Sequence, residues 1–290
     1  MPEAGWLTPD QEATLARLLR NESDVAYRRR VRTMLRYLDP QPGQMILDCG
    51  TGMGFYAQAL HRLFPQCRVV GVDGDPQALA FAQEHVGHHA VLTRGDIQRL
   101  PFAEASFDAV LLSEVLEHLE DDLGGLRQIH RVLKPGGVLA ITVPYERYPY
   151  WYDPINRVAE GVFRRPIRRG PFAGIWANHQ RLYGIEALRS VLAEAGFDAG
   201  PIEQLTHYCF PGTQTIVYTL GKGLIERNLL PGSVLRSTHR FSGEENRGSR
   251  LNPLNWALAL FHAIDRLNED PARLASKRTF ANLAVRATKV

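Results

Sequence analysis

A glycine-rich turn is the first feature of this 290-residue sequence that could serve chemistry. It directly follows an apolar run and holds Gly50, Gly52 and Gly54 at alternate positions. Glycine lets a ligand approach the backbone closely, and the helix predicted after the turn offers free N–H groups. Asp48 adds a carboxylate that repels a diphosphate but attracts an ammonium or sulfonium group. The turn therefore favours a positively charged ligand over a dinucleotide, for which the third glycine comes one residue later.

Polar positions also follow the ends of the next three apolar runs. Asp73 can accept both hydroxyls of a ribose. Asp96 offers an acceptor for an exocyclic adenine amine, and Ile97 an apolar side chain for the ring face. Ser113 follows the fourth run. Because open α/β sheets bind ligands beyond the carboxyl ends of their strands, these residues predict a single crevice.

The elements that must position these residues are short apolar strands alternating with helical patterns. The predicted parallel strands are 45–49, 68–72, 90–93, 107–112 and 138–143. The predicted helices between them are 55–64, 76–86 and 114–133. Continuous apolar strands of this kind indicate a parallel sheet covered on both faces. Two further candidate strands, 202–208 and 213–219, would pair antiparallel at the sheet edge and bring the total to seven.

These motifs resemble the class I S-adenosylmethionine-dependent methyltransferases, especially their small-molecule branch. ILDCGTGMG is similar to the first motif of the family, and VVGVDGDPQAL to its acidic second-strand motif. GDIQRLPFAEASFDAVLLSEVLEHL is similar to the adenine-binding segment and fourth strand, and RVLKPGGVLAITVP to the fifth strand. The likeness is dense over residues 43–143 and extends loosely to 220.

The resemblance implies S-adenosyl-L-methionine as the cofactor and assigns its contacts. By this resemblance Gly50, Gly52 and Gly54 lie against the methionine part, and Asp73 holds the ribose. Asp96 and Ile97 would hold the adenine, and Ser113 the amino acid moiety through its backbone. A doubly wound domain that binds another nucleotide is the alternative.

The fold class predicted from these elements is α/β, with a Rossmann-like, mostly parallel seven-stranded sheet and helices on both faces. We expect a helical N-terminal segment over 1–42, with a break near 21–23. The methyltransferase core would occupy 43–222 and include an aromatic lid insertion at 144–184. A helical C-terminal extension would follow over 223–290, with helices near 254–267 and 272–285.

Two histidines are candidates for a general base, which a weakly acidic hydroxyl acceptor requires. His118 lies four residues after Glu114, so a continuous helix would place both on one face just beyond the fourth strand. His179 ends the aromatic insertion. For each histidine, a purely structural role in satisfying neighbouring polar groups remains the alternative.

The insertion at 144–184 is rich in aromatic residues and arginines, which suggests an ordered lid over an extended or ring-bearing acceptor. Within it, Arg181 is a candidate clamp for an oxygen or anion, and Tyr183, Trp176 and Tyr145 are candidate ring contacts. Self-packing of the loop is the alternative for Trp176 and Tyr145. For Arg181 and Tyr183 the alternative is a loop at a helix N-terminus whose polar groups satisfy the backbone. Arg164, Arg165, Arg168 and Arg169 form a basic cluster that suits an anionic ligand or a membrane surface.

The composition restricts the compartment and the partners. The formal net charge of +3 is too small to indicate nucleic-acid binding. Three widely separated cysteines without C-x-x-C spacing predict neither a disulfide framework nor a metal site. We expect a cytoplasmic protein without a membrane span. The apolar stripe at 254–267 suits core packing or a homodimer contact, with peripheral contact at the inner membrane face as the alternative.

The resulting hypothesis is an enzyme that methylates a small-molecule or lipid-like acceptor, at oxygen, by direct displacement with a histidine base. A nucleic-acid or protein methyltransferase is a second hypothesis, although the Asn/Asp-Pro-Pro-Tyr element of amino-methylating DNA enzymes does not follow the fourth strand. A non-catalytic protein that binds the cofactor in a regulatory role is a third.

Overall fold

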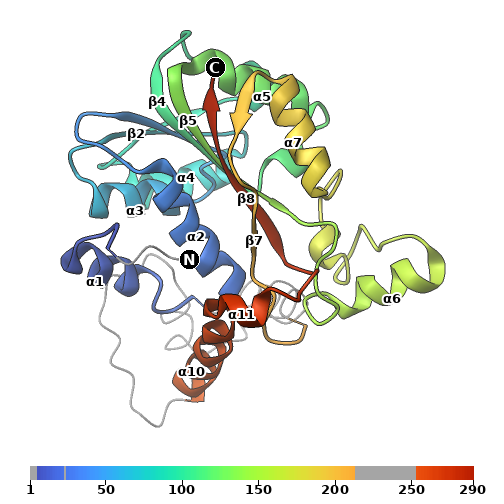
Figure 1. Ribbon diagram of the computed structural model, residues 1–290. Helices are drawn as coiled ribbons and strands as arrows, with labels where there is room; N and C mark the ends of the chain where they lie inside the picture. Colours follow the sequence, from blue (N-terminus) through green and yellow to red (C-terminus); the bar gives the residue numbers. More distant parts are fainter. Residues whose placement is uncertain (1–4, 23, 213–252) are drawn as a thin grey trace.

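The computed structural model describes residues 5–22, 24–212 and 253–290, and it contains a single twisted sheet with helices on both faces (Figure 1). The strands lie in the order β3-β2-β1-β4-β5-β8-β6, and β7 also pairs with β8. The parallel strands are β1 (Met45–Cys49), β2 (Arg68–Asp73), β3 (Val91–Arg94), β4 (Phe107–Ser113) and β5 (Leu133–Pro144). The mostly parallel α/β fold predicted from the sequence is confirmed.

Successive strand residues face opposite sides of the sheet, and each side has its own apolar core. On β1, Ile46 packs with α1 (Pro9–Leu18), α2 (Val25–Leu38), α3 (Phe55–Leu63) and α4 (Pro76–Val86). The next residue, Leu47, packs with α5 (Asp122–Val132) and α7 (Ile185–Glu194). Burial on both faces explains why these strands are continuous apolar runs.

The strand order reverses direction between β1 and β4. In open α/β sheets the loops on the two sides of such a reversal leave toward opposite faces, and ligands bind there beyond the carboxyl ends of the strands. The glycine turn lies at this position, because Gly54 is the N-cap of α3 directly after β1. The fold therefore gathers the four predicted cofactor segments at one edge of the sheet.

The C-terminal end of the chain is part of the sheet, contrary to the helix expected near 272–285. Helix α11 spans only Pro271–Leu274, and β8 (Asn282–Lys289) lies antiparallel between β5 and the short strands β6 (Phe197–Ala199) and β7 (Glu203–Leu205). A run of small and β-branched residues fits a strand buried between two neighbours better than a surface helix. The strand expected at 213–219 lies outside the described residues.

Helices α2 and α10 are joined by ion pairs. The break expected near 21–23 is confirmed, since α1 ends at Leu18 and α2 begins at Val25. Arg28 and Arg29 of α2 both pair with Asp265, the last residue of α10 (Pro253–Asp265). No helix of the described ranges has the length and apolar character that a membrane crossing would require.

The helix expected over 114–133 is interrupted. A short 3-10 turn, η2 (Leu116–His118), follows β4, and α5 begins only at Asp122. Glu114 has a left-handed backbone with φ of 55°, and Asp121 caps α5 by accepting from the Gly124 N–H at 2.7 Å. The prediction that Glu114 and His118 share one helix face is therefore wrong.

The insertion after β5 forms a helix that projects from the body of the molecule (Figure 1). This helix, α6 (Pro154–Phe163), is followed by an irregular segment and by the 3-10 turn η3 (Gly174–Trp176). The chain then returns to the sheet edge, where Tyr183 forms a bridge with Tyr145, and continues into α7.

Candidate active site

The glycine turn after β1 is held by the neighbouring strand. The N–H groups of Gly50 and Thr51 both donate to the Val72 carbonyl, at 2.8 and 3.0 Å. A Cβ on Gly50 would lie 2.4 Å from a methyl of Val115, whereas a Cβ on Gly52 would meet nothing within 4 Å. Gly50 is thus required for packing inside the protein, and Gly52 leaves open space where a ligand can approach.

Asp73, at the end of β2, connects the second strand to the glycine turn. One carboxylate oxygen accepts from the Gly52 N–H at 2.7 Å, and the other accepts from the Asp75 N–H at 2.9 Å. Each carboxylate oxygen has two lone pairs, so both retain acceptor capacity for ribose hydroxyls. The carboxylate is therefore oriented before a ligand binds.

Asp48 is buried beneath the turn, with 1% of its surface exposed. The Thr51 hydroxyl donates to its Oδ2 at 2.7 Å, while its Oδ1 is buried and has no hydrogen-bond partner. Burial raises the pKa of Asp48 to about 7, and the nearby charge of Asp73 also raises it. A cation at this position would stabilise the ionised form and use the free oxygen.

Three hydroxyl groups form a chain across the end of β4. The Ser113 Oγ lies 3.1 Å from the Tyr56 hydroxyl and 3.0 Å from the Thr142 Oγ1. Tyr56 comes from α3 and Thr142 from β5, so this chain joins the glycine-turn helix to the neighbouring strand. Because the Ser113 side chain already has partners within the protein, its backbone remains the predicted contact to the cofactor.

The adenine segment after β3 is only partly exposed. Asp96 is exposed, and its side chain caps η1 (Ile97–Arg99) by accepting from the Gln98 N–H at 2.9 Å. Ile97 is 8% exposed and belongs to the apolar core beside α5. The adenine contacts of Asp96 and Ile97 stay predictions.

Glu114 belongs to a buried polar cluster that joins distant parts of the chain. Its Oε2 accepts from the Asn282 side-chain amide at 2.8 Å and lies 3.7 Å from Arg30. Arg30 also lies 3.8 Å from Asp24 and donates to Asn282 at 3.2 Å. The cluster fixes α2 and β8 against the carboxyl end of β4.

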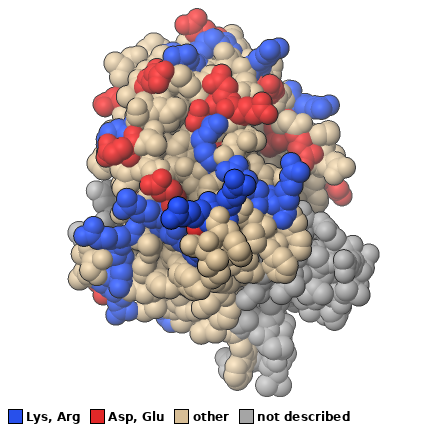
Figure 2. Space-filling view, turned by 90° about the vertical axis from the view of Figure 1, so that its right-hand side faces the viewer, with Lys and Arg blue, Asp and Glu red and all other residues tan. Residues whose placement is uncertain are grey.

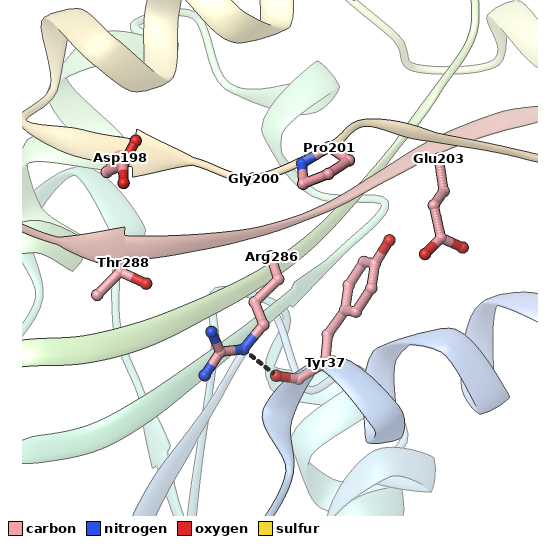
Figure 3. Close-up of a pocket in the computed structure, with 7 residues that line it drawn as sticks. All are labelled: Tyr37, Asp198, Gly200, Pro201, Glu203, Arg286 and Thr288. Carbon is pink, nitrogen blue, oxygen red and sulfur yellow. Dashed lines mark hydrogen bonds between the residues drawn. The ribbon is translucent and has the colours of Figure 1, made fainter. Parts of the chain in front are cut away.

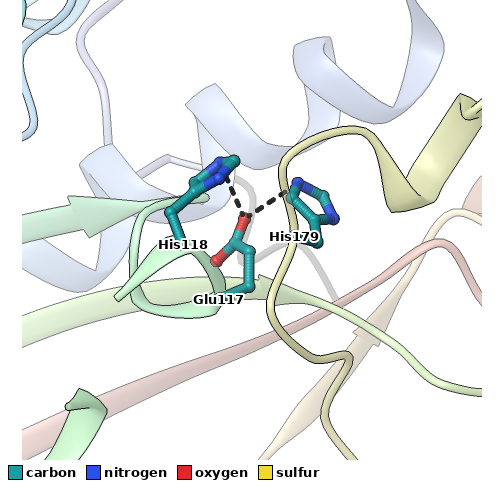
Figure 4. Close-up of side chains that lie close together, drawn as sticks. All are labelled: Glu117, His118 and His179. Carbon is teal, nitrogen blue, oxygen red and sulfur yellow. Dashed lines mark ion pairs between the residues drawn. The ribbon is translucent and has the colours of Figure 1, made fainter. Parts of the chain in front are cut away.

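The two candidate bases meet at a third residue, Glu117 (Figure 4). The Nε2 atoms of His118 and His179 lie 3.9 and 3.8 Å from Glu117 Oε1, and the two imidazole centroids are 4.6 Å apart. Glu117 is fully buried, and neither of its carboxylate oxygens has a hydrogen-bond partner.

Backbone hydrogen bonds hold this cluster together. The His118 Nδ1–H donates to the Asn178 carbonyl at 3.1 Å, and the Gln180 N–H donates to the Glu117 carbonyl at 2.8 Å. Each bond joins η2 to the segment after η3. The first bond also sets the His118 tautomer, which leaves Nε2 as an acceptor facing the cluster.

Burial keeps both imidazoles neutral. It lowers the pKa of His118, and burial followed by repulsion from His118 lowers the pKa of His179 to about 3. Burial and then the charge of Glu114 raise the pKa of Glu117 well above its ordinary value. The ligand atoms of Glu117, His118 and His179 all lie within 4.8 Å of one another, so they could also hold a metal ion.

The four predicted acceptor contacts all have partners within the protein. Tyr145 and Tyr183 are 5% and 3% exposed and belong to the main apolar core. Arg181 pairs with Asp122 at 2.9 Å, and the Tyr183 hydroxyl donates to the same carboxylate at 2.7 Å. The Trp176 Nε1–H donates to Glu160 at 2.7 Å. Their contact with an acceptor stays a prediction.

A hollow of about 360 Å³ lies beside β8, between the end of α2 and the segment that joins β6 to β7 (Figure 3). It is lined in part by Tyr37, Glu203 and Arg286, and the Arg286 Nε–H donates to the Tyr37 carbonyl at 3.0 Å. Thr288, another lining residue, pairs with Val138 in the middle of β5. Neither the glycine turn nor His118 or His179 lines this hollow.

Comparison with known proteins agrees with the geometry. Residues 47–141 match the model of a methyltransferase domain. A demethylmenaquinone methyltransferase of Thermus thermophilus is 32% identical over 195 residues, which cover 63% of this chain and 86% of the relative. The chain belongs to the class I S-adenosylmethionine-dependent methyltransferases.

Two other relatives match a smaller share of this chain. A demethylmenaquinone methyltransferase of Deinococcus radiodurans is 39% identical over 33% of this chain and 41% of the relative. A sterol 24-C-methyltransferase of Eremothecium gossypii is 28% identical over 54% of this chain and 40% of the relative. The chain thus spans well under two thirds of the length of these two relatives.

Solved structures support the fold of the methyltransferase. The [4+2]-cyclase SpnF superposes with a TM-score of 0.53 at 18% identity, covering 90% of this chain and 80% of the cyclase. A phosphoethanolamine N-methyltransferase of Haemonchus contortus, solved with S-adenosyl-L-methionine, gives 0.52 at 19% identity over 91% and 52% of the two chains. At these identities the likeness concerns the fold alone.

The residues of the crevice fit the cofactor of this family, S-adenosyl-L-methionine. The unpartnered buried oxygen of Asp48 and the open space at Gly52 suit a cationic amino acid group. The oriented carboxylate of Asp73 suits a ribose.

Sequence reasoning missed Glu117 and Tyr56. Glu117 is adjacent to His118 in the sequence, but its significance depends on His179, which is 62 positions away. Tyr56 lies in a helix whose other residues are mostly apolar, where its hydroxyl gave no signal. Only the fold reveals the partners of these two side chains.

Proposed function

We propose that this methyltransferase methylates a hydroxyl oxygen of a small, lipid-like acceptor and that His118 accepts the hydroxyl proton. The observation that carries the proposal is the hydrogen bond from His118 Nδ1–H to the Asn178 carbonyl. This bond leaves Nε2 as a proton acceptor on η2, the turn that follows β4 and Ser113 in the chain. Bound S-adenosyl-L-methionine supplies an electrophilic methyl group for direct displacement.

His118 is a better base than His179, although the sequence favoured both. A general base works best when its pKa lies near the working pH. Burial lowers the pKa of His179 to about 3, which makes its imidazole a weak proton acceptor. The side chain of His118 is 40% exposed, against 14% for His179, so an acceptor can reach it. We assign His179 the role of positioning the cluster.

Glu117 gives the protonated base a partner. When the Nε2 of His118 takes the acceptor proton, a positive charge develops 3.9 Å from the Glu117 carboxyl group. The charge favours ionisation of Glu117, and the resulting ion pair stabilises the imidazolium. The acceptor proton is then on His118, the proton of Glu117 has passed to solvent, and the ion pair leaves the cluster without net charge.

The relatives support a lipid-like acceptor, and they favour carbon as a second candidate for the methylated atom. One is named a sterol 24-C-methyltransferase and another a ubiquinone/menaquinone biosynthesis C-methyltransferase. A ring carbon beside an ionised hydroxyl is itself nucleophilic, so the same base could serve either atom. Nuclear magnetic resonance of a product carrying a ¹³C methyl group distinguishes O-methyl from C-methyl.

Replacement of the base tests the proposal. We expect His118→Ala to lower kcat by about 10²- to 10⁴-fold, the usual contribution of general base catalysis, with unchanged cofactor affinity by calorimetry. In the wild type, kcat/KM should fall as pH drops through the lowered pKa of His118, below its ordinary value of 6.5. His88→Ala, an exposed histidine after α4, is the matched control. Unchanged kcat in His118→Ala would rule out His118 as the base.

A further inference from the structure

The projecting helix α6 exposes large apolar side chains. Val158, Val162 and Phe163 are 46%, 68% and 72% exposed, while Asn156 and Ala159 on the same helix are buried. Single exposed apolar residues are ordinary, but a group of them on one projecting element marks a contact surface.

The segment directly after α6 is strongly basic. Arg164, Arg165, Arg168 and Arg169 are all exposed. No acidic residue occurs between Gly161 and Ile185. Figure 2 views the molecule from the side on which α6 projects, and it shows basic side chains gathered in a band across that face.

The basic segment folds back onto the helix, so the two form one surface. The Asn156 side chain accepts from the Ile167 N–H at 2.7 Å and donates to the Phe172 carbonyl at 3.2 Å. Arg168 lies 4.7 Å above the Trp176 ring. We call the combined set the apolar–arginine surface: Val158, Val162, Phe163, Arg164, Arg165, Arg168 and Arg169.

Within the described ranges, no acidic side chain pairs with the arginines of this surface. Among the described residues, Arg164, Arg165 and Arg169 form no ion pair. The nearest acidic residue along the chain, Glu160, already pairs with Arg157 at 3.4 Å and accepts from Trp176. The surface therefore combines free positive charge with exposed apolar groups.

We propose that the apolar–arginine surface docks on a lipid bilayer that contains anionic phospholipids. Apolar side chains can enter the boundary between headgroups and acyl chains, while the arginines contact the phosphates. A nucleic acid would satisfy the arginines but would leave Val158, Val162 and Phe163 in water. The bilayer is the partner that uses both halves of the surface.

The same segment leads directly to the catalytic cluster. The Asp153 carboxylate, at the start of α6, accepts from the Ile175 N–H at 2.9 Å, and Asn178 and His179 follow within four residues. Docking would thus place the lid, and the cluster behind it, next to the membrane in which a lipid-like acceptor dissolves. This connection rests on the proposed function, whereas the docking itself does not.

The test is co-sedimentation of the full chain with phosphatidylcholine vesicles, with and without phosphatidylglycerol. We expect binding that requires phosphatidylglycerol and weakens with salt. Val162→Ser/Phe163→Ser and Arg164→Gln/Arg165→Gln should each weaken binding by about tenfold or more. Val290→Ser, exposed at the C-terminus, and Arg127→Gln/Arg189→Gln, on α5 and α7, are the matched controls and should bind like the wild type.

Several results would overturn the docking proposal. They are equal binding by the two surface variants and the controls, equal binding to vesicles without phosphatidylglycerol, and binding to duplex DNA but not to vesicles. Circular dichroism checks that each variant is folded. Methylation of a water-soluble acceptor should be unchanged in the surface variants, so failure of docking and failure of the proposed function are separate outcomes.

Discussion

The predicted cofactor side of the methyltransferase consists of short turns that each follow a neighbouring strand, whereas the proposed acceptor side joins segments far apart in the chain. The glycine turn, Asp73 and Ser113 all fall within residues 47–141, which match the family model. The proposed catalytic cluster instead needs Glu117, His118 and His179, and the adjacent polar cluster needs Arg30 and Asn282. The cofactor side is therefore recognisable locally, and the acceptor side depends on the whole fold.

The largest expected effect is a loss of stability when the C-terminal strand β8 is changed. Leu283 on β8 is fully buried, so we expect Leu283→Ala to reduce the free energy of unfolding by about 2–5 kcal/mol. Chemical denaturation measures the loss. Leu260→Ala, on the exposed side of α10, should change it by less than about 0.5 kcal/mol. Equal stability of the two variants would contradict the placement of β8 inside the sheet.

A slightly smaller effect is expected on the cofactor side. Asp73→Ala removes the acceptor predicted for the ribose and also releases the Gly52 N–H, so cofactor affinity should fall by about 100-fold. Isothermal titration calorimetry measures it. Asp75→Ala, which removes the cap of α4, is a control that should affect stability more than affinity. Undiminished affinity in Asp73→Ala would refute the ribose assignment.

Replacement of Glu117 by glutamine tests the burial of this carboxyl group on the proposed acceptor side. The property to compare is how the stability of the variant and of the wild type depends on pH. The folded state raises the pKa of Glu117, so the unfolded chain ionises first as pH rises and the wild type loses stability above the ordinary value of 4.5. The amide does not ionise. We therefore expect Glu117→Gln to be more stable than the wild type at neutral pH, and this difference to disappear below pH 4.5. A pH-independent difference in Tm would contradict this assignment.

The smallest expected effect is that of chelation. If His118 acts as a base, it must be free of metal, so incubation with a chelator should leave kcat unchanged. The ligand atoms of Glu117, His118 and His179 nevertheless lie within 4.8 Å of one another. Loss of turnover on chelation, restored by zinc or manganese, would identify these three side chains as metal ligands instead.

Much of the fold follows from local patterns. Each continuous apolar run between residues 45 and 143 became a strand, because burial on both faces of a sheet demands apolar residues throughout. The patterns failed at 114–133 and 272–285. In the first, Glu114 takes a left-handed backbone and Asp121 starts a new helix, and in the second, a run of small residues fills a central strand.

The sequence by itself determined the parallel sheet, the glycine turn and the carboxylates at the strand ends, since strand periodicity and turn chemistry act over a few residues. It also supplied both histidines. Only the tertiary structure decided that they face Glu117, that Tyr145 and Tyr183 are buried in the core, and that the last strand completes the sheet. Contacts between residues dozens of positions apart depend on how the elements pack, and no local pattern encodes that packing.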